Sequence, residues 1–191
     1  MSGAITPTQT VGPFHHIELP VPGGGQLVDP GSPGAVRIAG RVLDGAGDPV
    51  GDALIEVWQA GPSGRYRHPA DTRELPLPET FTGFGRVATA ADGSFELWTV
   101  KPGPVPGPAD APGTVQAPHL LCSVLARGLL DRLVTRLYFP DEVEANAADP
   151  ILALVPDPAA RATLVAEAQE DGSLRFDIHL QGEQETVFFA I

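Results

Sequence analysis

Short segments in which hydrophobic and polar residues alternate predict a chain built mainly of β-strands. Val36, Ile38 and Val42 share one face of a segment with a period of two, and a turn-forming cluster follows at 44–49. Short apolar or alternating runs bounded by Gly and Pro occur at 36–42, 53–59, 84–89, 95–99, 119–127, 132–139, 174–181 and 185–190. Such runs are typical of two packed sheets. The sequence therefore predicts an all-β fold, a β-sandwich of about eight short antiparallel strands with long Pro/Gly-rich loops.

The turns between these segments indicate which strands are neighbours. The Ala91-Asp92-Gly93 turn predicts that 84–89 and 95–99 pair as a hairpin. A second pair is expected from 119–127 and 132–139. The proline-rich segment 101–117 is too long for a hairpin loop, so we expect it to cover a face or to line a site.

Helical signals are few. Asp157 is a suitable N-cap and Pro158 a suitable first residue for a helix over 158–169, and a shorter helical turn is expected within 141–148. Residues 1–34 are rich in Pro, Gly and Thr and show no sustained period. We therefore expect two parts: an N-terminal arm and interface segment at 1–34, and the sandwich at 35–191.

Composition and charge narrow the classes of partner. The 24 acidic and 12 basic side chains give a formal net charge of -12, which disfavours binding to nucleic acid or to anionic lipid. No apolar run approaches the ~20 residues that span a bilayer, and residues 1–10 do not have the pattern of a secretory signal. The single cysteine, Cys122, fits a reducing compartment. A cytoplasmic location is expected.

Residue chemistry alone predicts no reaction. His179 lies on the polar face of an alternating strand, where a solvated histidine is the ordinary interpretation. His15 and His16 are adjacent and would point apart in an extended chain, which makes them a poor metal-binding pair. No Gly-rich phosphate loop and no Gly-x-Ser-x-Gly nucleophile motif is present in the sequence.

A series of short motifs, in order, carries more information. It comprises Gly64-Arg65-Tyr66-Arg67-His68, Phe84-Gly85-Arg86, Val100-Lys101-Pro102-Gly103-Pro104, Ala117-Pro118-His119 and Thr135-Arg136-Leu137-Tyr138-Phe139. This series resembles the intradiol ring-cleaving dioxygenases, and the resemblance runs from about Pro7 to the C-terminus. It implies an oxidoreductase of aromatic catabolism.

The resemblance also implies a metal site that this chain has lost. Family members hold a non-haem ferric ion with two tyrosines and two histidines. Tyr66 and His119 match one ligand of each type, whereas Val105 and Leu121 stand at the other two positions. Aliphatic side chains cannot coordinate iron, and the remaining pair is too small a ligand set to retain it. We therefore expect these four to be degenerate ligand positions and this chain to bind no metal.

Heteromeric members of the family combine an iron-bearing β chain with a homologous α chain that lacks the iron, and this sequence resembles the α chain. The resemblance implies that the β chain holds Fe(III) and that the site lies at the junction of the two chains. There it cleaves a carboxylate-bearing catechol with O2, and this chain is not expected to be active alone. Substrate-pocket residues implied for this chain are Thr10, Gly12, Pro13, Phe14 and Arg127. Arg127 could equally form an ordinary ion pair. The alternative function is a metal-free β-sandwich scaffold or binding module.

Overall fold

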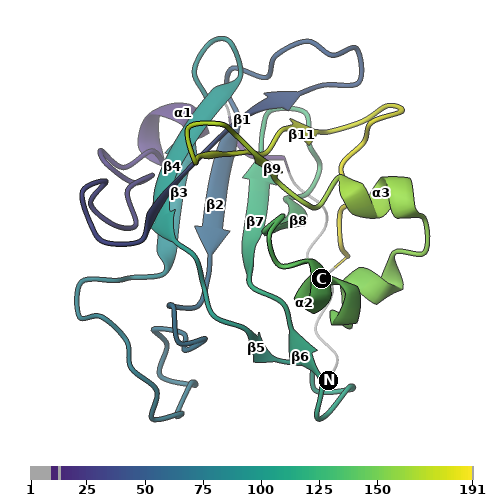
Figure 1. The fold of residues 1–191 in the computed structure, drawn as a ribbon. Coiled ribbons are helices and arrows are strands. Elements are labelled where there is room, and N and C mark those ends of the chain that lie inside the picture. Colours follow the sequence, from purple (N-terminus) through teal and green to yellow (C-terminus); the bar gives the residue numbers. More distant parts are fainter. Residues whose placement is uncertain (1–9, 13, 191) are drawn as a thin grey trace, which may run out of the picture.

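The computed structural model describes residues 10–12 and 14–190, which form a sandwich of two β-sheets (Figure 1). The first sheet is built around β1, which pairs antiparallel with β4 and parallel with both β10 and β11, while β9 pairs with β10. Its strands are β1 (Ala35–Leu43), β4 (Ser94–Val100), β9 (Glu167–Ala168), β10 (Leu174–Arg175) and β11 (Ile178–His179). The predicted sandwich is confirmed, although the sheet is mixed rather than wholly antiparallel.

The second sheet is antiparallel, with the strand order β3-β2-β7-β8. Its strands are β2 (Leu54–Trp58), β3 (Phe84–Ala88), β7 (His119–Leu125) and β8 (Leu133–Tyr138). A separate small hairpin of β5 (Val105–Pro106) and β6 (Val115–Gln116) lies at one end of the sandwich, beyond the ends of β2 and β7 (Figure 1). The proline-rich segment therefore contributes a short ribbon beside the beginning of β7.

In the second sheet, side chains along each strand alternate between an inner face, which packs on the first sheet, and an outer face. Ile55 and Val57 of β2, together with Leu120 of β7 and Leu137 of β8, are buried in the main core between the sheets. Their sequence neighbours on the same strands point to the outer face, because successive strand residues alternate in direction. A smaller second core under the helices includes Tyr138 of β8.

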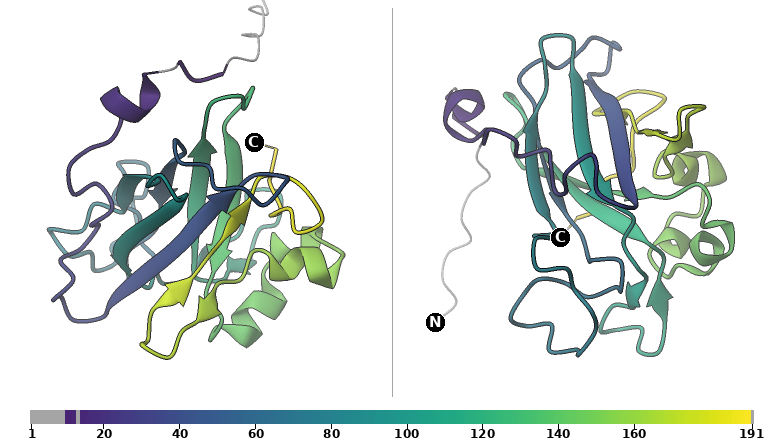
Figure 2. Two further views of the ribbon diagram at one scale, coloured as in Figure 1. Left: turned by 90° about the horizontal axis from the view of Figure 1, so that it is seen from above. Right: turned by 60° about the vertical axis from the view of Figure 1, so that its left-hand side comes forward.

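Helices are short and lie on two sides of the sandwich (Figure 2). They are α1 (His15–Glu18), α2 (Val143–Ala148), the 3-10 helix η1 (Leu152–Leu154) and α3 (Pro158–Ala162). The expected helical turn within 141–148 is confirmed by α2. In Figure 2, α1 stands on one side of the sheets, opposite α2 and α3. No helix in the described part of the chain is long and apolar enough to cross a membrane.

The hairpin predicted for 84–89 and 95–99 is wrong. β3 pairs with β2, and β4 pairs with β1, so the turn at 90–94 carries the chain from one sheet to the other. The alternating side chains Phe95 and Leu97 are buried against the facing sheet. A period of two indicates a buried face, but it does not identify the neighbouring strand.

Two further predictions near the C-terminus need correction. Asp157 caps α3 as predicted, accepting hydrogen bonds from the backbone N–H groups of Ala159 and Ala160, but the helix ends at Ala162 rather than at residue 169. Beyond Ala162 the chain forms hydrogen bonds with the backbone of Tyr138 instead of continuing as a helix. The predicted strand 174–181 is divided into β10 and β11, and 185–190 is not a strand although Phe189 N–H donates to the Val134 carbonyl.

Candidate functional site

The outer face of the second sheet places three side chains in one row across its strands. Trp58 of β2 lies opposite Leu121 of β7, which in turn lies opposite Arg136 of β8. In the adjacent row, His119 of β7 lies opposite Tyr138 of β8, with ring centroids 5.6 Å apart. His119 and Leu121 are two residues apart on one strand and therefore project from the same face.

Tyr66 reaches this face from the connection between β2 and β3. Its ring stacks on Trp58 with centroids 5.8 Å apart and an interplanar angle of 9°. The loop is held by Asp71, which accepts a hydrogen bond from Tyr66 N–H and forms an ion pair with Arg73 at 2.6 Å. Gly64, with φ of +79°, is needed here because a Cβ at this position would lie 2.1 Å from the Pro104 carbonyl oxygen.

A cavity of about 660 Å³ opens between the Tyr66 loop and the β5–β6 hairpin. Its walls combine aromatic rings, an aliphatic side chain from the β5–β6 hairpin and a few polar groups. They include Trp58, Tyr66, His68, Arg73, Val105 and Gln116. Val105 and Gln116 pair directly with one another across the hairpin. Such a mixture of flat apolar walls with a few polar groups is typical of small-molecule pockets.

Hydrogen bonds join the cavity wall to the buried second core. Arg136 Nη1 donates to Gln116 Oε1 at 2.7 Å and to the Tyr138 hydroxyl at 3.2 Å. The Tyr138 hydroxyl donates to Asp149 Oδ1, and Asp149 Oδ2 accepts from Ala117 N–H. Asp149 is 1% exposed. A half-buried guanidinium and a buried carboxylate are thus connected through one phenol.

The electrostatics of this network keep His119 neutral. Burial, reinforced by the positive charge of Arg136, lowers the pKa of His119 to about 4. Nδ1 lies 2.7 Å from the Ala117 carbonyl oxygen, so the neutral ring carries its proton there. Burial also raises the pKa of Tyr66, partly opposed by Arg136 and Arg73, so its hydroxyl is protonated at neutral pH.

The four positions that the resemblance assigns to metal ligands lie at this end of the sandwich, but their side chains do not fit a ferric ion. Tyr66 and Val105 line one cavity, while His119 and Leu121 lie on the adjoining strand face. Val105 is 4% exposed and offers no donor atom. Leu121 lies opposite a guanidinium. Within residues 10–12 and 14–190, no group of three or more His, Cys, Asp or Glu side chains could hold a metal ion.

Arg127 and the N-terminal arm meet at the other end of β7. Arg127 follows that strand and its Nε donates to the Asp52 carboxylate, although 68% of its side chain is exposed. The Asp52 carbonyl oxygen lies 2.7 Å from Nε2 of His15, whose Nδ1 lies 3.1 Å from the Gly12 carbonyl oxygen. Thr10, Gly12 and Phe14 are exposed, whereas Pro13 is outside the described residues. Of the implied pocket residues, Gly12 is thus linked to Arg127 through His15 and Asp52, and Arg127 is separated from His119 by the length of β7.

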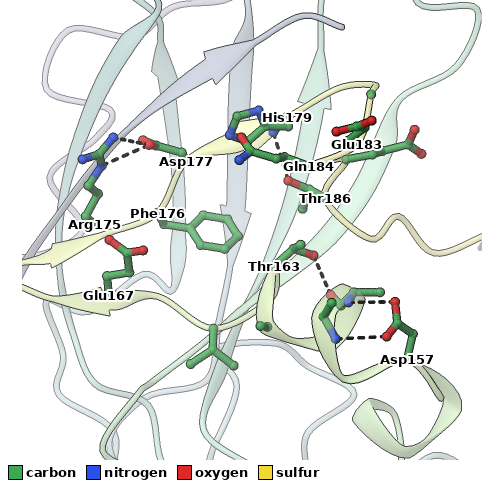
Figure 3. Close-up of a pocket in the computed structure, with 16 residues that line it drawn as sticks. Asp157, Thr163, Glu167, Arg175, Phe176, Asp177, His179, Glu183, Gln184 and Thr186 are labelled. Carbon is green, nitrogen blue, oxygen red and sulfur yellow. Dashed lines mark hydrogen bonds and ion pairs between the residues drawn. The ribbon is translucent and has the colours of Figure 1, made fainter. Parts of the chain in front are cut away.

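A second cavity, of about 610 Å³, lies between α3 and the C-terminal segment (Figure 3). It is lined by His179 and by several carboxylates, of which Asp177 forms an ion pair with Arg175 at 2.5 Å. Asp157, which caps α3, also lies on its wall. None of the residues implied by the resemblance lines this cavity.

Sequence reasoning missed the side chains that link the site together. Trp58, Gln116, Arg136, Tyr138 and Asp149 were assigned no role. One signal was present in the sequence: Arg136 and Tyr138 are two residues apart on the strand predicted to pair with 119–127, just as His119 and Leu121 are on that strand. The sequence did not show which of the many carboxylates would reach them.

Comparisons with known proteins identify the family of this chain. Residues 21–182 match a family model described as "Dioxygenase". The protocatechuate 3,4-dioxygenase alpha chain of Pseudomonas putida is 44% identical over 96% of this chain and 95% of its own length. The protocatechuate 3,4-dioxygenase beta chain of Burkholderia cepacia is 39% identical over 79% of this chain and 66% of its own length. A solved dioxygenase domain from Streptomyces sp. SirexAA-E superimposes with a TM-score of 0.60 and 30% identity, covering 83% of this chain and 87% of that one. The chain therefore belongs to the intradiol dioxygenase family.

Proposed function

We propose that this chain is the alpha subunit of a protocatechuate 3,4-dioxygenase. Together with an iron-bearing beta subunit it cleaves protocatechuate with O2 to 3-carboxy-cis,cis-muconate, a step of aromatic catabolism in the cytoplasm. Two features together support the proposal. The chain is similar to alpha chains over nearly its full length, and Val105 and Leu121 stand where the family has two metal-binding side chains. The non-haem iron characteristic of the family then belongs to the partner.

The arm and Arg127 are the part of this chain that we assign to the partner's active site. Phe14 and Ile17 are apolar side chains of the arm that are 67% and 62% exposed, and their burial against a protein partner would remove them from water. Most of the Arg127 side chain is exposed, and its ion-pair partner Asp52 contacts His15 of this arm. A guanidinium at that edge would attract the carboxylate of protocatechuate, which the net charge of -12 otherwise repels. This chain thus shapes part of the substrate pocket, excludes water from it and supplies a positive charge.

Activity should depend on assembly. We expect the chain purified alone to show no oxidation of protocatechuate, and the same chain co-expressed with an iron-bearing beta subunit to form a complex that consumes O2 and protocatechuate in equal amounts. The measurement is oxygen uptake together with product absorbance. A stable chain that pairs with no beta subunit, and that is inactive in every pairing, would favour the scaffold function instead.

Arg127→Ala in the assembled complex is expected to raise KM for protocatechuate at least about tenfold or to lower turnover, because a charge-assisted hydrogen bond contributes about 1.5–3 kcal/mol. Steady-state kinetics with the complex is the measurement. Arg127→Lys should recover part of the loss, and Arg132→Ala, at an exposed position in the β7–β8 connection, should have no effect.

A further control separates substrate binding from local structure. Asp52→Asn weakens the ion pair with Arg127 while leaving its guanidinium in place. If Asp52→Asn reproduces the full defect of Arg127→Ala, the role of Arg127 is structural. If both variants have wild-type kinetics, Arg127 has no part in the reaction.

A further inference from the structure

On the outer face of β7 and β8, one positive charge contacts a phenol and an amide, and the phenol ring packs against an imidazole. Arg136 extends from β8 opposite Leu121, and its guanidinium donates to Gln116 and to the Tyr138 hydroxyl. Tyr138 in turn lies against His119. A side-chain cation therefore already lies among the polar groups beside His119.

The guanidinium is held firmly in this position. Besides its two hydrogen bonds, Arg136 lies over the Phe189 ring with its Cζ atom 5.9 Å from the ring centroid. The Tyr138 hydroxyl connects it to the buried carboxylate of Asp149, which is itself fixed by backbone N–H groups of Ala117, Ile151 and Leu152. A planar group with several fixed partners costs little further entropy to hold in place.

We infer that the positive charge of the Arg136 guanidinium, which is bonded to Gln116 and Tyr138, excludes metal ions from this end of the sandwich independently of the missing donor side chains. The inference deepens the proposed metal-free role of the chain and rests on it. Two like charges a few ångströms apart in a partly buried site repel strongly, so a trivalent ion cannot enter while the guanidinium remains. Restoring donors at Val105 and Leu121 is therefore insufficient to create a metal site.

The test compares donor-restored chains with and without the positive charge. One variant carries Val105→Tyr and Leu121→His, and a second carries the same two changes together with Arg136→Gln. Ferric iron, supplied as ferric citrate, is titrated into each full-length chain purified alone, and bound iron is measured after desalting and by the absorption of a phenolate–ferric bond. We expect the variant with Arg136→Gln to bind iron at least tenfold more tightly than the variant that keeps Arg136.

Controls separate the local charge from general effects. Arg136→Lys in the donor-restored background keeps a positive charge and should bind iron no better than with Arg136. Arg132→Gln removes a charge from the exposed β7–β8 connection and should give no gain. Arg136→Met offers a second neutral side chain if Arg136→Gln does not fold, as judged by circular dichroism and thermal unfolding.

Two results would overturn the inference. One is tight iron binding by the donor-restored chain that still carries Arg136. The other is an equal gain from Arg132→Gln, which would show that only net charge matters. Neither result bears on the proposed function, which instead fails if the unaltered chain binds iron.

Discussion

Gly40→Ala is expected to destabilise the fold by more than about 3 kcal/mol, because a side chain at this position collides with backbone rather than with a flexible group. A Cβ on Gly40 would lie 1.8 Å from the carbonyl oxygen of Phe176 and 3.1 Å from the ring of Phe95. Phe176 cannot retreat freely, since its N–H donates to the Ala39 carbonyl and the neighbouring Asp177 carboxylate accepts from Arg41 N–H. Gly40 is therefore required where the chain passes from β10 to β11 beside β1.

Thermal and denaturant unfolding would measure this loss. A destabilisation of this size corresponds to a fall in Tm of at least about 6 °C for a chain of this length. Gly31→Ala is the matched control, because among the residues that the structure describes a Cβ there would meet only the Asp29 carboxylate within 4 Å, at 3.3 Å and outside the sheets. A Gly40→Ala protein with the Tm of the control would show that β1 and the C-terminal segment are not packed as described.

Acid is expected to destabilise the chain by about 3 kcal/mol between pH 6.5 and pH 4 through His119 alone, since each unit of pKa difference corresponds to about 1.4 kcal/mol. The folded chain keeps His119 neutral with a pKa of about 4, whereas the unfolded chain releases it to its ordinary pKa of 6.5. Within this window the unfolded state binds the extra proton. The free energy of unfolding therefore falls as the pH is lowered.

Denaturant unfolding at several pH values would test this dependence. His119→Asn removes the titrating ring while keeping an N–H donor for the Ala117 carbonyl, so the slope of stability against pH between 6.5 and 4 should flatten even though absolute stability is lower. The Asp71 carboxyl, whose pKa is held below its usual range chiefly by hydrogen bonding to Arg73, adds a loss only below about pH 4. An unchanged slope in His119→Asn would contradict the buried, neutral state of His119.

The sequence allowed prediction of the strands but not of all their partners. Period-two alternation located β1, and short apolar runs bounded by turn residues located β2 and β7, whose positions are mostly buried. These patterns did not predict that β4 would pair with β1 rather than with β3, since the choice of partner depends on where both apolar faces can be buried together. Helix α3 ended early for a related reason: the Asp157 N-cap is a local signal, whereas the competing hydrogen bonds to Tyr138 came from β8.

The candidate site was likewise predictable in its local motifs but not in the contacts between distant segments. The motifs around Tyr66 and His119 are local, and their positions at one end of the sandwich follow from the family resemblance. The link from Arg136 through Tyr138 to Asp149 depends on side chains that three separate segments bring together. Hydrophobic periodicity carries no information about such contacts, because they join polar groups from distant parts of the chain.

Iron stoichiometry tests the central claim most directly. The full-length chain and its complex with an iron-bearing beta subunit would be purified in parallel, and iron per polypeptide measured by elemental analysis alongside visible absorption. The account predicts essentially no iron and no colour in the chain alone, and about one ferric ion per beta subunit in the complex. Stoichiometric ferric iron with a phenolate absorption band in the isolated chain would contradict it.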